Sequence, residues 1–315
     1  MGPYILRRLL WAPVLLLIVS FVTFALGRFG PGDPVQLLLG QHYNPEVAQR
    51  IREQRGLDKN MAAQYGIYMR GVLRGDFGES YKYRGRAVAD LLIQKIPVSA
   101  QLQLAALIIS VGLGIPAGLF AALKQGSPWD TAAVVAALAG QSLPVFLTAP
   151  VLLLVFALKL DWLPSHGWGG FFDSRIVMPA VVLGIPEVAF LTRLTRASIL
   201  DVVGQDYIRT ARAKGLPERT VRGRHILRNA LVPVVTNLGF SLAGLVGGSF
   251  VVETTFGIPG VGLLGVEALF ARDYPVIMAF TLIGTTLFVL ANLLVDLAYP
   301  LLDPRIRLGG GYVAG

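Results

Sequence analysis

The sequence contains no cysteine and only three histidines, which lie far apart at His42, His166 and His225. The lack of cysteine excludes disulfides and thiolate metal sites, and the scattered histidines do not predict a metal cage. The chain also lacks the pattern G-x-x-x-x-G-K-S/T, so it has no P-loop to bind nucleotide phosphates. We therefore expect no metal or other cofactor in this chain and no ATP hydrolysis by it.

Charged residues are scarce too. They make up 15% of the chain, against 54% hydrophobic residues, and this balance lies outside the range of soluble domains. The net charge of +9 does not predict a nucleic-acid partner, because no basic domain is interleaved with aromatic residues. Membrane lipid is the first partner that the composition predicts.

Long apolar runs, in contrast, are abundant. Six of them are long enough to cross the hydrocarbon core of a bilayer, at 9–29, 98–123, 132–158, 177–196, 230–252 and 276–301. The first run is too long for a signal peptide and no small-residue cleavage site follows it, so we expect a retained anchor. The sequence predicts an all-α, polytopic membrane protein with six transmembrane helices.

Lysine and arginine are distributed unequally between the two sides of this predicted bundle. With the N-terminus inside, fourteen basic residues fall on the inner side, whereas the two short outer loops together hold three. This bias predicts that both termini lie in the cytoplasm. The predicted parts are the cytoplasmic N-terminus with the first transmembrane helix (1–29), an extracytoplasmic helical segment (30–97), a five-helix core (98–301) with a cytoplasmic loop (193–229), and a cytoplasmic tail (302–315).

The outer segment between the first two runs carries signals for three short helices. Asn44 is expected to cap the first helix, and Gly56 is expected to end it. The second helix is predicted at 61–74, where apolar residues recur at helical spacing, and the third at 87–96, ending at Pro97. The segment either braces the bundle or meets a partner or substrate on the outer face.

The stretch QDYIRTARAKGLPERTVRGRHILRN, residues 205–229, contains seven basic and two acidic residues between two apolar runs. We name it the basic loop. It predicts two short helices separated by Gly215 in a left-handed conformation. Tyr207, Ala211 and Lys214 recur at the spacing of one helix face, and small residues there let another surface approach closely. We expect this face to dock on a partner; the alternative is an anchor that contacts anionic lipid headgroups.

The basic loop resembles a cytoplasmic loop of the inner-membrane permease subunits of ABC importers, in the dipeptide, oligopeptide and nickel group. In that class the loop carries E-A-A, three residues and then glycine. Here Arg209, Thr210 and Ala211 stand at the E-A-A positions and Gly215 stands at the glycine. Of the later I-x-L-P motif, only the leucine is present.

Four other stretches resemble the same group and extend the resemblance to nearly the whole chain. They are ILRRLLWAPVLLLIVSFVTF leading to GPGDP, GLDKNMAAQYGIYMRGVLRGDFGES, VVETTFGIPGVGLLGVEALFARDYPV and NLLVDLAYPLLDPRIR. Within the third, FGIPGVG at 256–262 predicts a turn between membrane segments whose backbone must be buried or wet.

The resemblance implies a type I importer fold and a multi-pass permease subunit in a prokaryotic inner membrane. The subunit would form half of a translocation path for peptides or a related small solute, and it would work by alternating access. The implied partners are a second homologous permease subunit, two ATPase subunits or domains that bind ATP and Mg, and an extracytoplasmic substrate-binding protein. The implied ATPase-docking residues are Tyr207, Arg209, Thr210, Ala211, Lys214 and Gly215.

Transport also requires a polar path, and polar side chains in membrane helices are candidates because each is costly there unless it is satisfied. The candidates are Gln141, Glu187, Asn237 and Asn292. Glu187 follows a proline, so a broken helix can turn its carboxylate toward a cavity. Its alternatives are a hydrogen bond between helices with the acid protonated, or an ion pair with a neighbouring chain. Gln141, Asn237 and Asn292 are residue types that more often join helices than bind a solute.

Glycines at helical spacing indicate where helices can cross closely. Gly114 and Gly118, and Gly244 and Gly248, have the spacing G-x-x-x-G. The pattern is weak by itself, because 36 glycines in the chain make chance matches easy.

Two other functions are compatible with a polytopic membrane chain, but the sequence favours them less than an importer subunit. A stand-alone secondary transporter is expected to show inverted repeats and ion-coupling residues, but the sequence has no clear repeat and only Glu187 suits that role. An intramembrane enzyme requires a Ser/His or metal constellation in the bilayer, whereas all three histidines fall in predicted loops.

Overall fold

The structure is a computed structural model that describes residues 2–29, 34–39, 44–54, 56–244 and 247–302. Within these ranges the chain forms helices and loops, with a single isolated bridge between Glu79 and Ala87 and no strand. Four of the described helices are long and apolar enough to cross a membrane, and the number rises to six if each of two bent pairs is one span. The chain is a helical, multi-pass membrane protein.

The long helices are α1 (Gly2–Phe29), α5 (Val88–Leu123), α8 (Val177–Val203) and α14 (Tyr274–Leu302). One bent pair is α6 (Pro128–Ser142) with α7 (Val145–Leu152) and the π-helix η2 (Leu153–Lys159); the other is α12 (Phe250–Phe256) with α13 (Val261–Ala271). The shorter helices are α2 (Pro34–Leu39), α3 (Pro45–Gln54), α4 (Met61–Val72), η3 (Ser174–Ile176), α9 (Asp206–Ala213), α10 (Glu218–Thr220), η4 (Val221–Leu227) and α11 (Arg228–Ala243).

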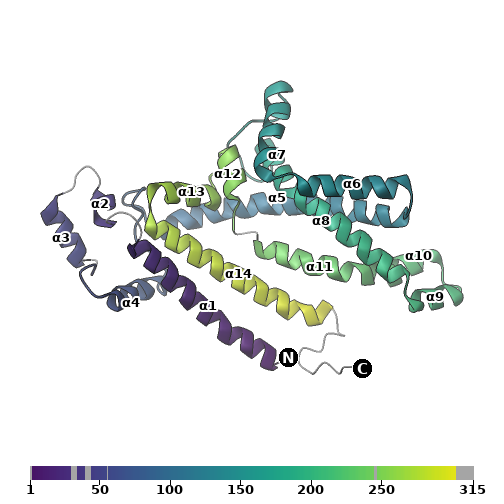
Figure 1. Cartoon of the computed structure of the whole chain (residues 1–315), viewed down its shortest axis with the longest axis horizontal. Coiled ribbons are helices and arrows are strands. Elements are labelled where there is room, and N and C mark those ends of the chain that lie inside the picture. Colours follow the sequence, from purple (N-terminus) through teal and green to yellow (C-terminus); the bar gives the residue numbers. More distant parts are fainter. Residues whose placement is uncertain (1, 30–33, 40–43, 55, 245–246, 303–315) are drawn as a thin grey trace.

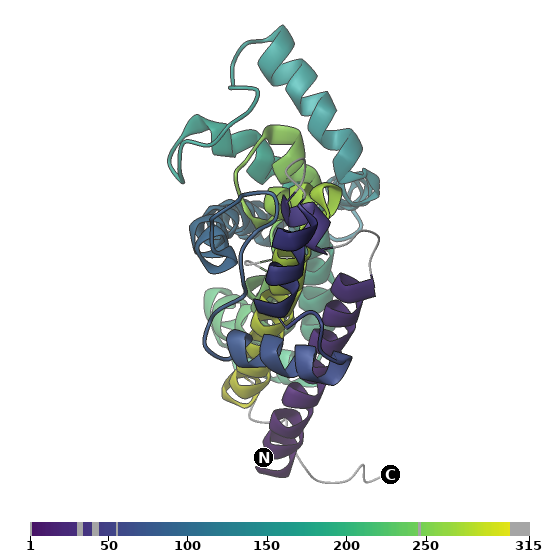
Figure 2. The ribbon, with the colours of Figure 1, turned by 90° about the vertical axis from the view of Figure 1, so that its left-hand side faces the viewer.

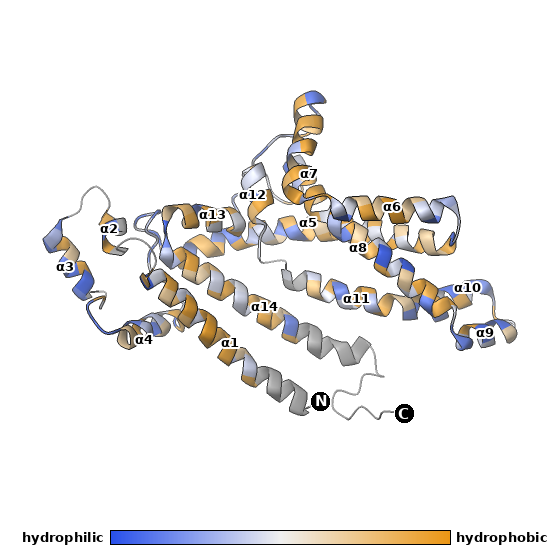
Figure 3. Ribbon diagram, viewed as in Figure 1, coloured by the Kyte–Doolittle hydropathy of each residue, from blue (hydrophilic) through white to orange (hydrophobic). Residues whose placement is uncertain are grey.

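The long helices form an elongated bundle in which α8 contacts α5 and α11, and α14 contacts α11 and α1 (Figure 1). Helices α3 and α4 lie at one end of this bundle, and α9 and α10 lie at the other. Helix α7 packs against α8 and α12, and the segment formed by α7 and η2 projects from the bundle (Figures 1 and 2). Hydrophobic residues dominate the long helices, whereas α9, α10 and α3 are rich in hydrophilic residues (Figure 3). The two hydrophilic ends fit a bundle that spans a bilayer.

Helices α5 and α8 cross with almost no side chain between them. A Cβ atom added at Gly118 would lie 2.5 Å from the carbonyl oxygen of Thr192 and 2.7 Å from the Cβ of Thr195. A Cβ added at Gly114 would lie 2.8 Å from the Cβ of Leu191. The close crossing predicted from this G-x-x-x-G pair is therefore confirmed.

The predicted run 132–158 is not one helix. It breaks at Leu143 and Pro144, and the segments on either side meet at 100°. Leu143 is extended, with ψ 116°, because the ring of the following proline disfavours the helical conformation. The break turns α7 and η2 away from α6.

The predicted run 230–252 is also interrupted. Helix α11 continues from η4 without a break and ends at Ala243, before the predicted end of the run. Gly248 has φ +65°, a conformation that favours glycine, and Ser249 then caps α12. The pair Gly244 and Gly248 therefore does not lie on one helix, and the crossing that its spacing suggested is absent.

Helix α5 is longer than predicted. The expected short helix at 87–96 and the run 98–123 are one helix of 36 residues, with Pro97 in its interior. Proline is tolerated in apolar helices because neighbouring groups satisfy the freed backbone carbonyl. At about 54 Å, α5 exceeds the thickness of a bilayer core, so it links the outer segment directly to the bundle.

The other predicted signals of the outer segment are confirmed. Asn44 caps α3, since its Oδ1 accepts a hydrogen bond of 2.9 Å from the backbone N–H of Glu46, and Gly56 follows with φ +63°. Helix α4 packs on α1, where the hydroxyls of Tyr65 and Ser20 lie 2.8 Å apart. The segment is thus anchored on the first long helix.

Residues 75–87 are held against the α13–α14 junction by charged and polar side chains. The Ser80 hydroxyl donates to the buried carboxylate of Asp273. The ammonium group of Lys82 lies 2.8 Å from the carboxylate of Glu267, which also accepts a hydrogen bond from the Tyr83 hydroxyl. Within this chain, the contacts of the outer segment therefore brace the bundle.

Candidate functional site

A cavity between α5, α8 and α11 is lined by one of the four residues predicted for a polar path, Glu187, and a second, Asn237, is hydrogen-bonded to it. Oε1 of Glu187 on α8 accepts hydrogen bonds from Nδ2 of Asn237 (3.0 Å) and from Oγ of Ser241 (2.9 Å), both on α11. Pro186 lies inside α8, which continues to Val203. The carboxylate thus joins two helices and faces the space between them and α5.

The cavity has a volume of about 210 Å³, and its polar lining comes from Gln103 and Ser110 on α5, Glu187, and Ser241. Glu187 lies ten residues after Val177, the first residue of α8, and therefore about 15 Å along the helix. A polar cavity at this depth in an apolar bundle suits the passage or binding of a polar solute.

The other two predicted path residues lie elsewhere. The side-chain oxygen of Gln141 accepts a hydrogen bond from Arg193 at an exposed position. Asn292 lines a separate groove between α1 and α14, with Trp11 and Leu15. The four candidates therefore do not lie together in this chain, because sequence position within a helix does not reveal which neighbour a side chain faces.

The basic loop is fixed to the end of the bundle by an apolar cluster. Ile208 and Ala211 of α9 are buried against Val221 of η4 and against Ala122 and Ile199, near the ends of α5 and α8. Because this cluster joins the loop to two long helices, a force on the loop is transmitted to both.

The helix, glycine and helix pattern predicted for the loop is confirmed. Helix α9 ends at Ala213, Gly215 has φ +73°, and α10 begins at Glu218. Glu218 accepts hydrogen bonds from Arg212 at 2.8 Å and from Arg222 at 3.2 Å. The hydrogen bond from Arg212, with the charges of both arginines, lowers the pKa of Glu218, so the pair stays ionised across neutral pH.

Five of the six predicted docking residues are exposed: Tyr207, Arg209, Thr210, Lys214 and Gly215. Ala211 is the exception, with 6% of its surface exposed, because it follows Ile208 by one turn and packs with it into the cluster. Within this chain Ala211 therefore contacts the apolar cluster and not the solvent. The exposed surface is cationic, since the side chain of Arg209 is 76% exposed.

A buried carboxylate that the sequence analysis did not single out holds α12 and α13 against α5. Glu253 is fully buried, and it accepts hydrogen bonds from the Ser99 hydroxyl (2.8 Å), the Ser249 N–H (3.0 Å) and the Leu263 N–H (3.0 Å). The Ser99 hydroxyl also accepts a bond of 2.9 Å from the Val261 N–H. An acid inside an apolar run is itself a signal of function or structure, and VVETTFGIPG contains that signal.

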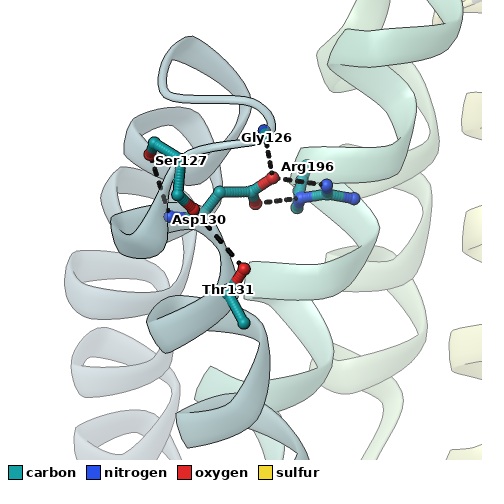
Figure 4. A network of polar contacts seen from close by, with 5 residues as sticks. All are labelled: Gly126, Ser127, Asp130, Thr131 and Arg196. Carbon is teal, nitrogen blue, oxygen red and sulfur yellow. Dashed lines mark hydrogen bonds and ion pairs between the residues drawn. The ribbon is translucent and has the colours of Figure 1, made fainter.

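A second acid outside the predicted set joins α6 to α8 (Figure 4). Both carboxylate oxygens of Asp130 bind the Arg196 guanidinium, at 2.5 and 2.8 Å, and one also accepts from the Gly126 N–H at 3.0 Å. Asp130 lies three residues after Ser127, which caps α6, and this capping-box spacing is the sequence signal that marks it. Bidentate geometry makes the pair directional.

Replacing Asp130 by asparagine is expected to lower the temperature of unfolding of the purified protein by several degrees. The substitution removes the charge and leaves the partly buried Arg196 with one weaker acceptor. The measurement is thermal unfolding in detergent. Asp201→Asn is the matched control, since Asp201 is exposed on the same bundle end; equal unfolding temperatures for the two variants would contradict the expectation.

Comparison with known proteins agrees with this architecture. The family described as "Binding-protein-dependent transport system inner membrane component" matches residues 114–308, and the one described as "Binding-prot-dependent transport system membrane comp, N-term" matches residues 1–103. The oligopeptide transport system permease proteins OppB of Haemophilus influenzae and of Escherichia coli K12 are each 40% identical over 305 residues. In both cases the match covers 96% of this chain and 99% of the relative.

Solved structures share the fold at low sequence identity. A chain of the inward-facing methionine ABC transporter MetNI superposes with a TM-score of 0.54 and 17% identity, covering 68% of this chain and 96% of that one. A chain of an amino acid ABC transporter crystallised with histidines has a TM-score of 0.52 and 18% identity, covering 67% and 93%. This chain belongs to the family of inner membrane components of binding-protein-dependent transport systems.

Proposed function

We propose that the chain forms half of the translocation path of an ATP-driven peptide importer and that the basic loop receives the motion of the ATPase. The observation that carries the proposal is the loop itself. It exposes a cationic face around Arg209 and is joined to the ends of α5 and α8 by a buried apolar cluster. A stand-alone secondary transporter would not require such a surface.

The proposed topology has six membrane spans with both termini in the cytoplasm of a prokaryotic cell, in its inner membrane. The excess of lysine and arginine on that side supports this orientation. The basic loop, within residues 193–229, then lies in the cytoplasm, where an ATPase is accessible. The outer segment 30–97 lies on the opposite side, where a substrate-binding protein delivers cargo.

The proposed assembly contains a second homologous permease subunit, two ATPase subunits or domains, and a substrate-binding protein. ATP and Mg bind on the ATPases, since this chain has no P-loop. Docked ATPases pull on the basic loop when they close on ATP, and the cluster under α9 passes the movement to α5 and α8. The cavity at Glu187, between these helices and α11, is then opened to one side at a time.

Peptides are the proposed cargo. The relatives that match nearly the full length of this chain are oligopeptide transport system permease proteins. The polar cavity between α5, α8 and α11 is compatible with a solute that carries amide and charged groups. In the proposed cycle a binding protein selects the peptide, and this chain supplies the passage.

Affinity purification of the tagged chain from its own membrane, in mild detergent, tests the docking role. We expect ATPase subunits to co-purify with the parent chain and to be lost with Gly215→Pro and Arg209→Glu. Proline cannot adopt the φ of +73° found at Gly215, because its ring fixes φ near −65°. Arg209→Glu reverses the charge of an exposed side chain.

Two controls accompany this purification. Gly215→Asn is expected to retain the ATPase, since asparagine tolerates the left-handed conformation. Arg50→Glu makes the same charge change on α3, at the opposite end of the bundle, and is expected to retain it as well. ATPase recovery that is equal for Arg209→Glu and the parent would contradict docking through this face.

A further inference from the structure

Glu187 is bound on one side only. Both of its hydrogen bonds, from Asn237 and Ser241, reach Oε1. In the part of the chain that the structure describes, neither a hydrogen bond nor a lysine, arginine or histidine reaches Oε2. The carboxylate lines the 210 Å³ cavity, so its second oxygen is the one available to a solute there.

Among the residues that the structure describes, no lysine, arginine or histidine pairs with the Glu187 carboxylate. Two neutral donors on Oε1 hold its orientation and supply part of the solvation that it loses in the bundle. Acidic residues in membrane helices pair with cations or mark the passage of charged solutes, and within the described residues this acid has no such pair.

We propose that Oε2 of Glu187 binds the α-ammonium group of a peptide in transit, so that this cavity recognises the amino-terminal end of the cargo. The proposal rests on the proposed function, because it takes peptides as cargo. The α-amino group of a peptide has a pKa of about 7.7–8.0 and is mostly cationic at neutral pH. The carboxyl end of the same peptide is repelled by Glu187, which gives the site a preference for one end.

The size of the cavity and a further polar side chain in its lining, Gln103, agree with this assignment. A cavity of about 150 Å³ holds a benzene molecule, so 210 Å³ accommodates the terminal residue of a peptide. Gln103 also lines the cavity, and no described residue hydrogen-bonds its amide. Its amide can therefore pair with the first peptide group of the cargo while Glu187 binds the ammonium group.

The test uses the complete transporter with its own binding protein, reconstituted in proteoliposomes with ATP inside. Uptake of trialanine is compared with uptake of N-acetyl-trialanine, which lacks the cationic end, for the parent and for Glu187→Gln. For each transporter we take the ratio of trialanine uptake to N-acetyl-trialanine uptake. Because the parent and the variant use the same binding protein, its own preference cancels when one ratio is divided by the other. We expect Glu187→Gln to lower the trialanine to N-acetyl-trialanine ratio about tenfold, which corresponds to about 1.4 kcal/mol.

Two further variants keep the test decisive. Glu187→Asp retains the carboxylate and is expected to retain most of the preference for the free amino terminus. This variant provides the test if Glu187→Gln does not assemble. Glu46→Gln makes the same chemical change on exposed α3 and is expected to leave the ratio unchanged.

The outcomes separate this proposal from the one on which it rests. If the parent complex imports both peptides and Glu187→Gln slows both by the same factor, Glu187 acts in packing or pairs with another subunit, and the proposal is overturned. An unchanged ratio in both Glu187 variants overturns it too. If the parent complex hydrolyses ATP with its binding protein but imports neither peptide, peptide cargo itself is wrong.

Discussion

Replacing Glu253 by alanine is expected to destabilise the protein by several kcal/mol and to abolish uptake by the transporter. Three donors point at this carboxylate, from Ser99, Ser249 and Leu263. Each buried donor that loses its acceptor costs about 1–3 kcal/mol. All three hydrogen bonds attach the helix pair α12 and α13 to α5. We therefore expect this helix pair to detach from α5 before the bundle unfolds.

Glutamine at position 253 is expected to be nearly as damaging as alanine, although it has almost the same volume. Both oxygens of Glu253 act as acceptors, and the Ser99 hydrogen is directed to it because the Ser99 oxygen accepts from Val261. An amide offers one acceptor and one NH₂ donor. Whichever way it turns, the NH₂ group faces a donor.

Thermal unfolding of the purified complex and uptake in proteoliposomes measure the effect. Thr254→Ala is the matched control, because its side chain is exposed on the next position of the same helix. A Glu253→Gln variant that unfolds at the parent temperature and transports at the parent rate would show that the three hydrogen bonds do not hold α12 and α13 against α5.

Replacing Gly118 by leucine is expected to lower the free energy of unfolding by about 3 kcal/mol, which is the upper end of the usual range for overpacking. The Cβ alone would lie 2.5 Å from a backbone oxygen of α8 and 2.7 Å from the Cβ of Thr195. Neither atom is at the free end of a flexible side chain, so the two helices must separate. The separation also breaks the contact between the Thr192 hydroxyl and the carbonyl of Gly114.

Gly112→Leu on the same helix is the control for Gly118→Leu. A Cβ at Gly112 meets nothing within 4 Å, and the residue is exposed. Folded yield and unfolding temperature in detergent are measured for both variants. We expect Gly112→Leu to behave like the parent; a similar loss for both would mean that leucine at any glycine of α5 is harmful and that the crossing is not special.

Features set by local sequence were predicted well. Asn44 and Gly56 were correctly assigned as the ends of α3, and Gly215 as the left-handed residue between α9 and α10, because caps and left-handed turns depend on one or two residue types. The close crossing at Gly118 was also expected. The spacing alone did not distinguish it from the pair at Gly244 and Gly248, since only the partner helix decides.

Features that depend on tertiary contacts were missed. Apolar composition does not locate breaks, so it predicts single helices at 132–158 and 230–252, where the structure has interruptions. Ala211 was placed on an exposed face because its burial depends on Ala122, far away in the sequence. Glu253 and Asp130 were overlooked for the same reason, since their partners Ser99 and Arg196 are distant along the chain.

The crossing of α5 over α8 divides α5 into two arms of very different length. From Gly118 to the last residue of α5, Leu123, the distance is about 8 Å, whereas from Gly118 to the first residue, Val88, it is about 45 Å. The short arm ends at the cluster under the basic loop, and the long arm carries Ser99, which binds Glu253. Because α5 also contacts α8 at Ala106 and Ser110, close to Gly184, the two helices are held together over several turns, and a shift of α5 along its axis moves both arms by the same distance.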